Sequence, residues 1–268
     1  MGDTERRRQA EWVRGGRRDT ETQNPEPRTQ NQLSNSVLSP QSAVFASRGA
    51  VIVAAGRGTR MGADKVWLPL GPLPVVAYSL RVFSRHAARV VLVVAREKLA
   101  DAMGLVSELG IVATVCEGGE RRQDSVWRGL QSIGDVSFVA IHDGARPLVG
   151  GWLIDACYDA ARRYGAAVSA VKVRDTLKQG LPDGTIGATV DRDALWAAQT
   201  PQIFQTDLLR RAYEALEEEV TDDASAVERL GHPVKIVPGD PYNIKLTTRE
   251  DLEVARTLVA RRSRVEAV

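Results

Sequence analysis

The sequence predicts an α/β protein with a doubly wound, mostly parallel sheet, and two observations support this fold class. Short apolar runs recur along the chain, namely AVIVAA, VVLVVA, IVATV, FVAIHD and AAVSAV. The segments between them space their apolar residues as amphipathic helices do: 75–84, 98–109, 122–133 and 152–164. Apolar strands separated by such helices are typical of a parallel sheet covered on both faces. Ligands of these sheets bind beyond the carboxyl ends of the strands, where we therefore expect the site.

The composition of the chain changes at about residue 48. Residues 1–48 are rich in Arg, Gln, Asn, Ser and Pro, so they cannot bury enough apolar surface to offset their chain entropy. We predict a disordered extension there and one folded domain at 49–268; a misassigned start codon would also explain the segment. It lacks the apolar core of a secretory signal, and its acidic residues disfavour a transit peptide.

Bulk composition excludes several functional classes. Of the 268 residues 43% are hydrophobic, enough for one sizeable core, and the net charge of +2 gives no sign of nucleic acid binding. No segment approaches the roughly 20 apolar residues needed to span a bilayer. Cys116 and Cys157 are far apart and too few for a zinc site, so we expect buried thiols in a reducing cytoplasm.

Residues 173–195 interrupt the alternation of strands and helices. They have no helical period and carry a Pro-Asp-Gly turn between two β-prone arms, which predicts a projecting β-hairpin. A lone hairpin is only marginally stable in water, so we expect it to dock, with a partner subunit as one candidate.

The first candidate loop follows the strand AVIVAA. Gly56 and Gly58 let backbone N–H groups approach phosphate oxygens, and Arg60 and Lys65 add two cations that suit a triphosphate. Met61 takes the place of the third glycine of the dinucleotide-binding pattern, and no acidic residue ends the second strand, which disfavours a dehydrogenase. A purely structural tight turn is the alternative.

The second and third loops add a polar wall and a carboxylate. Residues 117–126, EGGERRQDSV, can form a pocket wall for a base and ribose, or can simply cap the next helix. Asp143 ends a strand expected to be buried, where a carboxylate is costly unless paired or metal-bound. Mg²⁺ takes one or two carboxylates plus substrate phosphates, so Asp143 can serve it; a salt bridge to Arg146 is the alternative. We expect His142 to be a packed residue at the strand end.

The last part of the chain gives weaker signals. Thr221 and Asp222 precede a predicted helix, which they can cap, and by composition alone Lys245 is an ordinary surface lysine. The sequence has no Ser/His/Asp order, H-E-x-x-H motif or paired carboxylates.

Eight motifs follow one another along residues 49–258: VIVAAGRGTRMG…K, GGERRQDSV, HDGARP, VRDT, TVDR, QTPQ, TDDAS and NIKLT. Each alone would be weak, but in this order they resemble the 2-C-methyl-D-erythritol 4-phosphate cytidylyltransferase family of the non-mevalonate isoprenoid pathway. The resemblance implies a Rossmann-like nucleotidyltransferase that transfers CMP from CTP to the sugar phosphate, releases pyrophosphate and uses Mg²⁺. It also implies a homodimer in which the hairpin reaches the neighbouring subunit.

The resemblance assigns roles to individual positions of this chain. The α-phosphate and the attacking phosphate are assigned to catalytic cations at Arg60, Lys65, Arg192 and Lys245. CTP is assigned to Ala54, Ala55, Gly56, Gly58, Gly119 and Ser125, and the metal to Asp143. The sugar phosphate is assigned to Arg146, Thr176, Arg192, Thr200, Thr221 and Lys245.

The chain departs from the family pattern at a few positions. Val66 and Trp67 follow Lys65 where Gln-Tyr is common, Glu120 replaces a frequent Asp, and Gly144 replaces a common Ala. None of these changes removes an assigned charge. A ribitol 5-phosphate cytidylyltransferase is the nearest alternative. A sugar-1-phosphate nucleotidyltransferase and a nucleotide-binding regulator without turnover are more distant ones.

Overall fold

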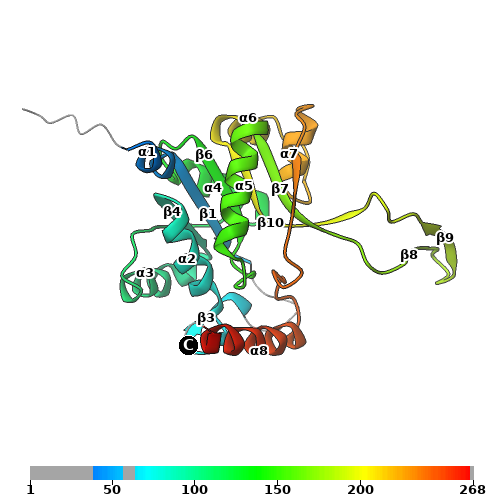
Figure 1. Ribbon diagram of the computed structural model, residues 1–268, viewed down its shortest axis with the longest axis horizontal. Coiled ribbons are helices and arrows are strands. Elements are labelled where there is room, and N and C mark those ends of the chain that lie inside the picture. The colour runs from blue at the N-terminus through cyan, green and yellow to red at the C-terminus, as the bar shows by residue number, and fades with distance from the viewer. Residues whose placement is uncertain (1–38, 57–63, 266–268) are drawn as a thin grey trace, which may run out of the picture. The chain divides into compact units, whose positions relative to one another are not determined.

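A central seven-stranded sheet organises the part of the chain that the structure, a computed structural model, describes, which is residues 39–56 and 64–265 (Figure 1). In spatial order its strands are β11 (Lys235–Pro238), β7 (Ala166–Lys172), β10 (Trp196–Gln205), β6 (Phe138–Asp143), β1 (Arg48–Ala54), β4 (Arg89–Val94) and β5 (Thr114–Glu117). The β1 strand pairs in parallel with β4 and with β6. The pairs β4–β5 and β7–β11 are also parallel. The predicted doubly wound, mostly parallel sheet is therefore confirmed.

Helices cover both faces of the sheet because β1 alternates its buried side chains between two cores. Ile52 packs with residues of α2 (Val75–His86), α3 (Leu99–Glu108) and α5 (Gly151–Tyr164), whereas Val51 packs with α4, α6 and α7. Helix α4 spans Arg122–Ser132, α6 spans Thr206–Glu214 and α7 spans Asp223–Arg229. A third cluster packs α8 (Arg249–Val265) against the short strand β2 (Pro69–Leu70), which pairs with β3 (Leu73–Pro74). No described helix combines the length and the apolar character that crossing a membrane requires.

The described structure begins before the predicted boundary at Gly49. Helix α1 (Pro40–Ala46) lies within the segment predicted to be disordered, and Ser39 caps it by accepting a hydrogen bond from the Ser42 amide. Arg48 already belongs to β1. A proline at the start of a helix and a serine cap are ordinary helix signals, which the polar composition of the segment concealed. The remainder of the predicted extension, residues 1–38, lies outside the described residues.

Strand β10 was missed by the sequence analysis, although it is the only strand paired with both β6 and β7 in the described sheet. It runs antiparallel to both, and its register shifts between Ala198 and Gln202. Pro201 falls inside that shift, where its missing N–H costs no regular ladder bond. The proline and the polar residues around it hide a central strand in the sequence. The third predicted strand also starts later than expected, at Thr114 rather than 111.

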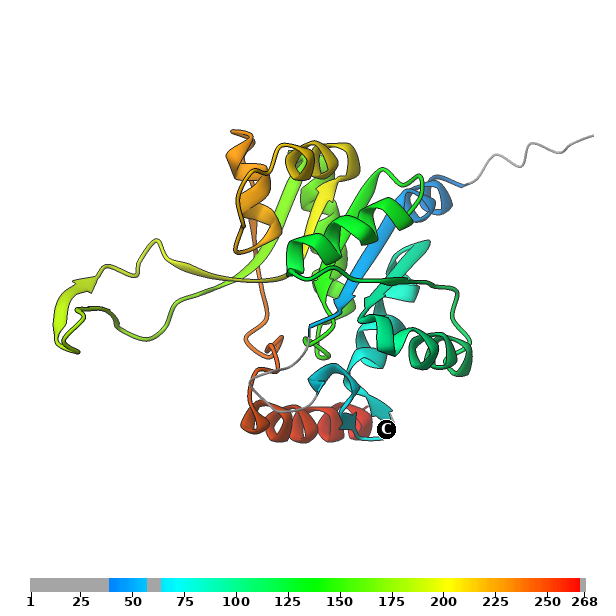
Figure 2. The same ribbon diagram turned by 180° about the vertical axis from the view of Figure 1, so that it is seen from behind.

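The predicted hairpin is confirmed as β8 (Leu177–Gly180) and β9 (Ile186–Val190), which pair only with each other within the described chain. Figures 1 and 2 both show it extending away from the sheet. Its turn uses Gly184 at a φ of 84°, a conformation that favours glycine. The exposed side chains include Leu181 and Ile186, and Ile186 is 65% exposed.

Helix α4 packs closely against the sheet at Gly129, which faces β1 and β4. A Cβ atom at this position would lie 2.4 Å from Cγ1 of Val51 and 3.0 Å from Cγ2 of Val93. Packed core side chains of neighbouring strands cannot both retreat without moving the helix. The glycine thus sets the short distance between α4 and the sheet. The first turn of α4 reaches the carboxyl ends of β1 and β6.

We expect Gly129→Ala to lower the free energy of unfolding by about 1–3 kcal/mol, because the added methyl group overpacks the contact between α4 and β1. Gly104→Ala is the matched control: this exposed glycine of α3 has no atom within 4 Å of an added Cβ. The control should gain up to about 1 kcal/mol from helix propensity alone. Urea unfolding of both variants gives the comparison, and equal effects would contradict the packing explanation.

Candidate active site

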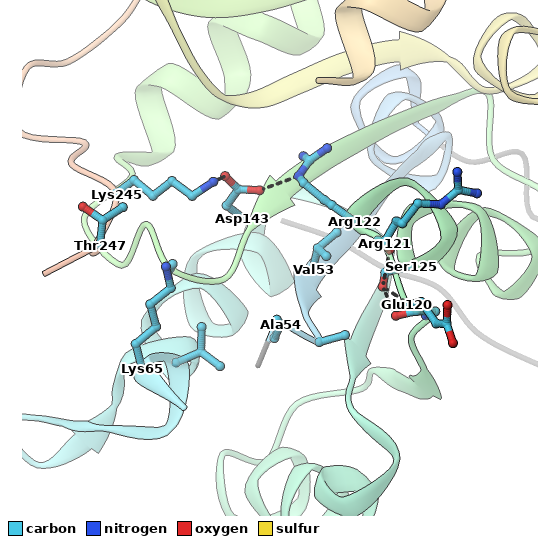
Figure 3. Close-up of a pocket in the computed structure, with 15 residues that line it drawn as sticks. Val53, Ala54, Lys65, Glu120, Arg121, Arg122, Ser125, Asp143, Lys245 and Thr247 are labelled. Atoms are coloured by element: carbon cyan, nitrogen blue, oxygen red, sulfur yellow. Dashed lines mark hydrogen bonds and ion pairs between the residues drawn. The ribbon is translucent and has the colours of Figure 1, made fainter. Parts of the chain in front are cut away.

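A cavity of about 300 Å³ opens at the carboxyl ends of β1 and β6 (Figure 3). The first turn of α4 lines one side of the cavity. The short helix η1 (Lys65–Trp67) and the segment before α8 line the other side. It therefore lies where ligands of doubly wound sheets bind. The lining residues are Val53, Ala54, Ala55, Gly56, Lys65, Val66, Gly119, Glu120, Arg121, Arg122, Ser125, Asp143, Ala145, Lys245 and Thr247.

Asp143 is the centre of a cluster of charges at the base of this cavity. Its Oδ2 lies 2.7 Å from Nζ of Lys245, and its Oδ1 accepts a 3.0 Å hydrogen bond from Nε of Arg122. Nε of Arg146 lies 4.0 Å from Oδ2. In Figure 3 Lys245 and Arg122 reach the carboxylate from opposite sides, and Lys65 extends from η1 toward the same space.

The charge of Asp143 is stable because of these neighbours. Burial alone would raise the pKa of this carboxyl group, but the nearby Arg122, Lys245 and Arg146 outweigh burial and hold its pKa well below the usual range. Arg122 shows the converse balance: burial acts to lower the pKa of its guanidinium, and Asp223 and Asp143 more than reverse this. Both groups are therefore charged at neutral pH.

Arg122 contacts a second carboxylate, that of Asp223, in addition to Asp143. Its NH2 group donates a 2.8 Å hydrogen bond to Oδ2 of Asp223, the first residue of α7, which is fully buried. The hydroxyl of Tyr213 donates to the other oxygen of Asp223 at 2.5 Å. A continuous chain of charge-assisted contacts thus runs from α6 through α7 and α4 to β6.

A second, uncharged chain of hydrogen bonds fixes the loop after β6. The Asp143 amide donates to Oγ1 of Thr200 at 3.0 Å, and that hydroxyl lies 3.2 Å from Nδ1 of His142. Nε2 of His142 lies 3.1 Å from the carbonyl oxygen of Arg146, which can only accept. Nε2 therefore donates to that carbonyl. Because burial lowers the pKa of His142 to about 4, the imidazole is neutral at pH 7, and Nδ1 accepts from Thr200.

Lys245 is positioned by the buried backbone around it. Asn243 is fully buried, donates from Nδ2 to the carbonyl of Thr200 at 2.8 Å, and accepts from Arg146 through its own carbonyl at 2.8 Å. The Leu246 amide donates to the carbonyl of Ala145 at 2.8 Å. The lysine that composition marks as an ordinary surface residue therefore belongs to a segment fastened to the loop of Asp143.

The second loop folds tightly around the start of α4. Oγ of Ser125 accepts a 3.1 Å hydrogen bond from the Gly119 amide. A Cβ atom on Gly119 would lie 2.3 Å from Cβ of Asp124, and one on Gly118 would lie 2.3 Å from Cβ of Ala55. Both glycines are required by these close approaches, which bring the loop against the end of β1.

The structure brings most of the predicted site residues together. Eight of them line the one cavity: Ala54, Ala55, Gly56, Lys65, Gly119, Ser125, Asp143 and Lys245. Arg146 and Thr200 do not line it but contact Asp143. The salt bridge to Arg146, given above as the alternative to metal binding, is present alongside two closer cations. Thr176 and Arg192 lie on the exposed hairpin segment and do not line the cavity; the Arg192 guanidinium donates to the carbonyl of Arg174.

Four further residues named in the sequence analysis need separate mention. Thr221 is exposed, and its hydroxyl lies 3.4 Å from that of Ser225, whereas the predicted cap Asp222 accepts from the Ser225 amide and caps α7. Gly58 and Arg60 fall between residues 57 and 63, outside the described residues.

Arg122 and Asp223 were not recognised as site residues from the sequence. One signal was available for Arg122, because a cation in the first turn of a helix faces the positive end of the helix dipole. An arginine there requires an acidic partner. That the partner would be Asp223, 101 residues away, could not be read from the sequence.

The residues present suit a divalent cation that arrives with a triphosphate. The described residues contain no group of three or more His, Cys, Asp or Glu that could hold a metal by itself. Asp143 is a single carboxylate, and its two oxygens retain lone pairs beyond those used by Lys245 and Arg122. Mg²⁺ is commonly held by one or two carboxylates together with substrate phosphates.

Comparisons with known proteins identify the family to which the chain is similar. The sequence model of the family described as IspD, 2-C-methyl-D-erythritol 4-phosphate cytidylyltransferase, matches residues 49–261. A protein of that name from Geobacillus kaustophilus is 45% identical over 223 residues, which are 80% of this chain and 97% of the relative. One from Pelotomaculum thermopropionicum is 46% identical over 224 residues, covering 80% and 94%.

Two crystal structures are similar to the fold of this chain. The 4-diphosphocytidyl-2C-methyl-D-erythritol synthase of Anaerococcus prevotii gives a TM-score of 0.71 at 29% identity and covers 81% of this chain and 99% of its own. The 2-C-methyl-D-erythritol 4-phosphate cytidylyltransferase of Thermus thermophilus gives a TM-score of 0.67 at 34% identity, covering 78% and 98%.

The buried, neutral His142 predicts a specific loss of stability in acid. The native imidazole stays unprotonated down to a pKa of about 4, whereas the unfolded one binds a proton below about 6.5, so stability falls as the pH drops through this window. The loss of unfolding free energy caused by His142 is absent above pH 7 and reaches about 2.5 kcal/mol near pH 4.5. Urea unfolding at about pH 7.5 and 4.5 should show His142→Gln losing that much less stability than the wild type. Equal losses in the two proteins would contradict a buried neutral histidine.

Proposed function

The chain belongs to the 2-C-methyl-D-erythritol 4-phosphate cytidylyltransferase family, and we propose that its cavity transfers CMP from CTP to 2-C-methyl-D-erythritol 4-phosphate with release of pyrophosphate. The observation that carries this proposal is the placement of Lys65, Arg122 and Lys245 around one cavity, beside Asp143. The family match does not favour ribitol phosphate as the acceptor.

The chemistry is mainly electrostatic. A phosphate monoester has its second pKa near 6, so most of the acceptor is already a dianion at neutral pH and needs no general base. His142 could not act as one, because it is fully buried and both ring nitrogens are hydrogen-bonded. What the reaction requires is that two anions meet in line and that negative charge on the leaving pyrophosphate is stabilised.

The cations of the cavity meet this requirement. Lys65, with Arg60, is assigned to the α-phosphate of CTP, where one preorganised charge commonly contributes on the order of 3 kcal/mol to the transition state. Lys245 orients the attacking phosphate, and Arg122 adds a fixed positive charge opposite it. Gly119 and Ser125 form the wall proposed to receive the cytosine.

Asp143 is the residue that would hold Mg²⁺ in this proposal. The ion, when bound with CTP, supplies positive charge that neutralises the phosphates. Asp143 is ionised for this task at any physiological pH, because its pKa is held low by Arg122, Lys245 and Arg146. The same carboxylate keeps Lys245 and Arg122 in place before the substrates arrive.

The hairpin is proposed to complete the acceptor side of the site in a homodimer. Thr176 and Arg192 are assigned to the sugar phosphate, yet they lie on an exposed segment outside the cavity of their own chain. The apolar Leu181 and Ile186 on the same arm are exposed, as a surface that another subunit covers would be. We propose the cytoplasm as the location, since both cysteines are free thiols.

Pyrophosphate release from CTP tests the acceptor directly. With Mg²⁺ present, 2-C-methyl-D-erythritol 4-phosphate should support turnover at least about 100-fold faster, in kcat/KM, than ribitol 5-phosphate, because a site built for one polyol leaves polar groups unpaired with the other. Comparable rates with both acceptors, or a preference for ribitol phosphate, would overturn the proposed acceptor. UTP and GTP in place of CTP check the base specificity.

Complementation tests whether the site is shared between subunits. Lys65→Ala and Arg192→Ala should each lower kcat about 100-fold or more. A mixed dimer has one site with both residues intact, so mixing the two inactive variants should recover about a quarter of wild-type activity. Mixing Lys65→Ala with Lys245→Ala is the matched control, because both lysines line one cavity of one chain and no intact site can form. Recovery in the control, or none in verified Lys65/Arg192 mixed dimers, would count against a shared site.

A further inference from the structure

Asp223 is a buried charge that the proposed reaction does not use. It is the first residue of α7, is 0% exposed, and does not line the cavity. Its two oxygens are directed to two different groups: Oδ2 to Arg122 at 2.8 Å and Oδ1 to the Tyr213 hydroxyl at 2.5 Å. A fully buried carboxylate is unfavourable for folding unless its partners compensate, and a buried ion pair is weak evidence for stability. Its presence therefore points to a purpose other than stability.

The geometry around Arg122 indicates that purpose. Its guanidinium is a planar fork, and the two carboxylates hold it from two sides: Asp143 at Nε and Asp223 at NH2. With both contacts made, the plane of the fork is fixed. About 30% of the side chain remains exposed and lines the cavity. A lysine or a singly held arginine would be free to rotate there.

The position of Arg122 on α4 makes the second carboxylate necessary. Arg122 is the first residue of the helix, where the helix dipole disfavours a cation. Asp143 alone cannot balance it, because that carboxylate also faces Lys245 and Arg146. Asp223 supplies the missing negative charge from the side away from the cavity.

We propose that Asp223 is a positioning residue, which together with Tyr213 holds the Arg122 guanidinium in the orientation that pairs with Asp143 and faces the bound triphosphate. Tyr213 orients the carboxylate of Asp223, since its hydroxyl donates to the oxygen that Arg122 does not use. The kinetic consequences of this positioning rest on the proposed function, whereas the positioning itself does not.

The proposal predicts that loss of the Asp223 charge lowers kcat without weakening the binding of CTP. Asp223→Asn preserves the shape of the side chain and can still accept from Tyr213, but it removes the charge that holds Arg122. The cavity becomes more positive, so the attraction of CTP does not weaken, while the guanidinium loses its fixed orientation. We expect kcat to fall about 10- to 100-fold with the KM for CTP unchanged or lower. Glu228→Gln, an exposed neutralisation on the same helix, is the matched control and should retain wild-type kcat.

A double-mutant cycle shows whether Asp223 acts through Arg122. In an Arg122→Gln background, Asp223→Asn should lower kcat/KM by less than about twofold further, because its target is already gone. Tyr213→Phe should show the same dependence on Arg122 with a smaller loss. Independent, multiplying losses, or a kcat of Asp223→Asn within twofold of the wild type, would overturn the proposal. The double variant removes both charges of the Arg122–Asp223 pair, and Tyr213→Phe removes neither. These two variants therefore still test the proposal if Asp223→Asn alone fails to fold.

Nuclear magnetic resonance of the arginine Nε–H group provides a readout independent of turnover. In the wild type without substrates, the Arg122 signal, identified by its loss in Arg122→Gln, should be sharp and slow to exchange with water. In Asp223→Asn it should broaden or exchange at least tenfold faster. An unchanged signal in that variant would overturn the positioning role. An inactive wild type with the expected signals would instead overturn the proposed function and leave the positioning intact.

Discussion

The charge on Asp143 is the constraint on which the rest of the site depends. The carboxylate ends a central strand and is only 7% exposed, so it can stay ionised only if cations are brought to it. They come from three different parts of the chain: Arg122 from α4, Arg146 from the loop after β6, and Lys245 from the segment before α8. One buried negative charge therefore forces distant segments to converge. The positive lining that suits a triphosphate follows from that convergence.

Neutral hydrogen bonds give this cluster a fixed frame. Thr200 sits where the ladder of β10 is interrupted, so its hydroxyl and carbonyl are available to the Asp143 amide and to Asn243. His142 completes the frame by joining that hydroxyl to the Arg146 carbonyl. An antiparallel strand inserted beside β6 is thus what brings these partners to the end of the parallel strands. Ion pairs set the charge of the site, and these bonds set its shape.

The sequence was sufficient for features that depend on local pattern and insufficient for those that depend on pairing across the chain. The apolar runs and helical spacings predicted the parallel strands, the helices around them and the hairpin, because period and turn chemistry are local properties. Strand β10 escaped because Pro201 and its polar neighbours break the strand pattern, and only the sheet around them makes a strand there. Lys65, Asp143 and Lys245, which line one cavity, were assigned to the site through motifs. Asp223 was missed, since only the tertiary contact with Arg122 distinguishes it from a helix cap.

The distribution of charge separates the two halves of the proposed reaction. The nucleotide half is built within one chain, where Lys65 lines the cavity and Arg122 is held by Asp143 and Asp223 before any substrate binds. Part of the acceptor half is assigned to Thr176 and Arg192, on an arm with exposed apolar side chains that no other element of the described chain covers. A rigid cationic cavity lowers the cost of bringing two anions together, since its charges need no reorganisation. In the proposed dimer, the arm would bring Arg192 to the acceptor only when the arm is docked on a second subunit. Assembly and catalysis would therefore depend on the same contact.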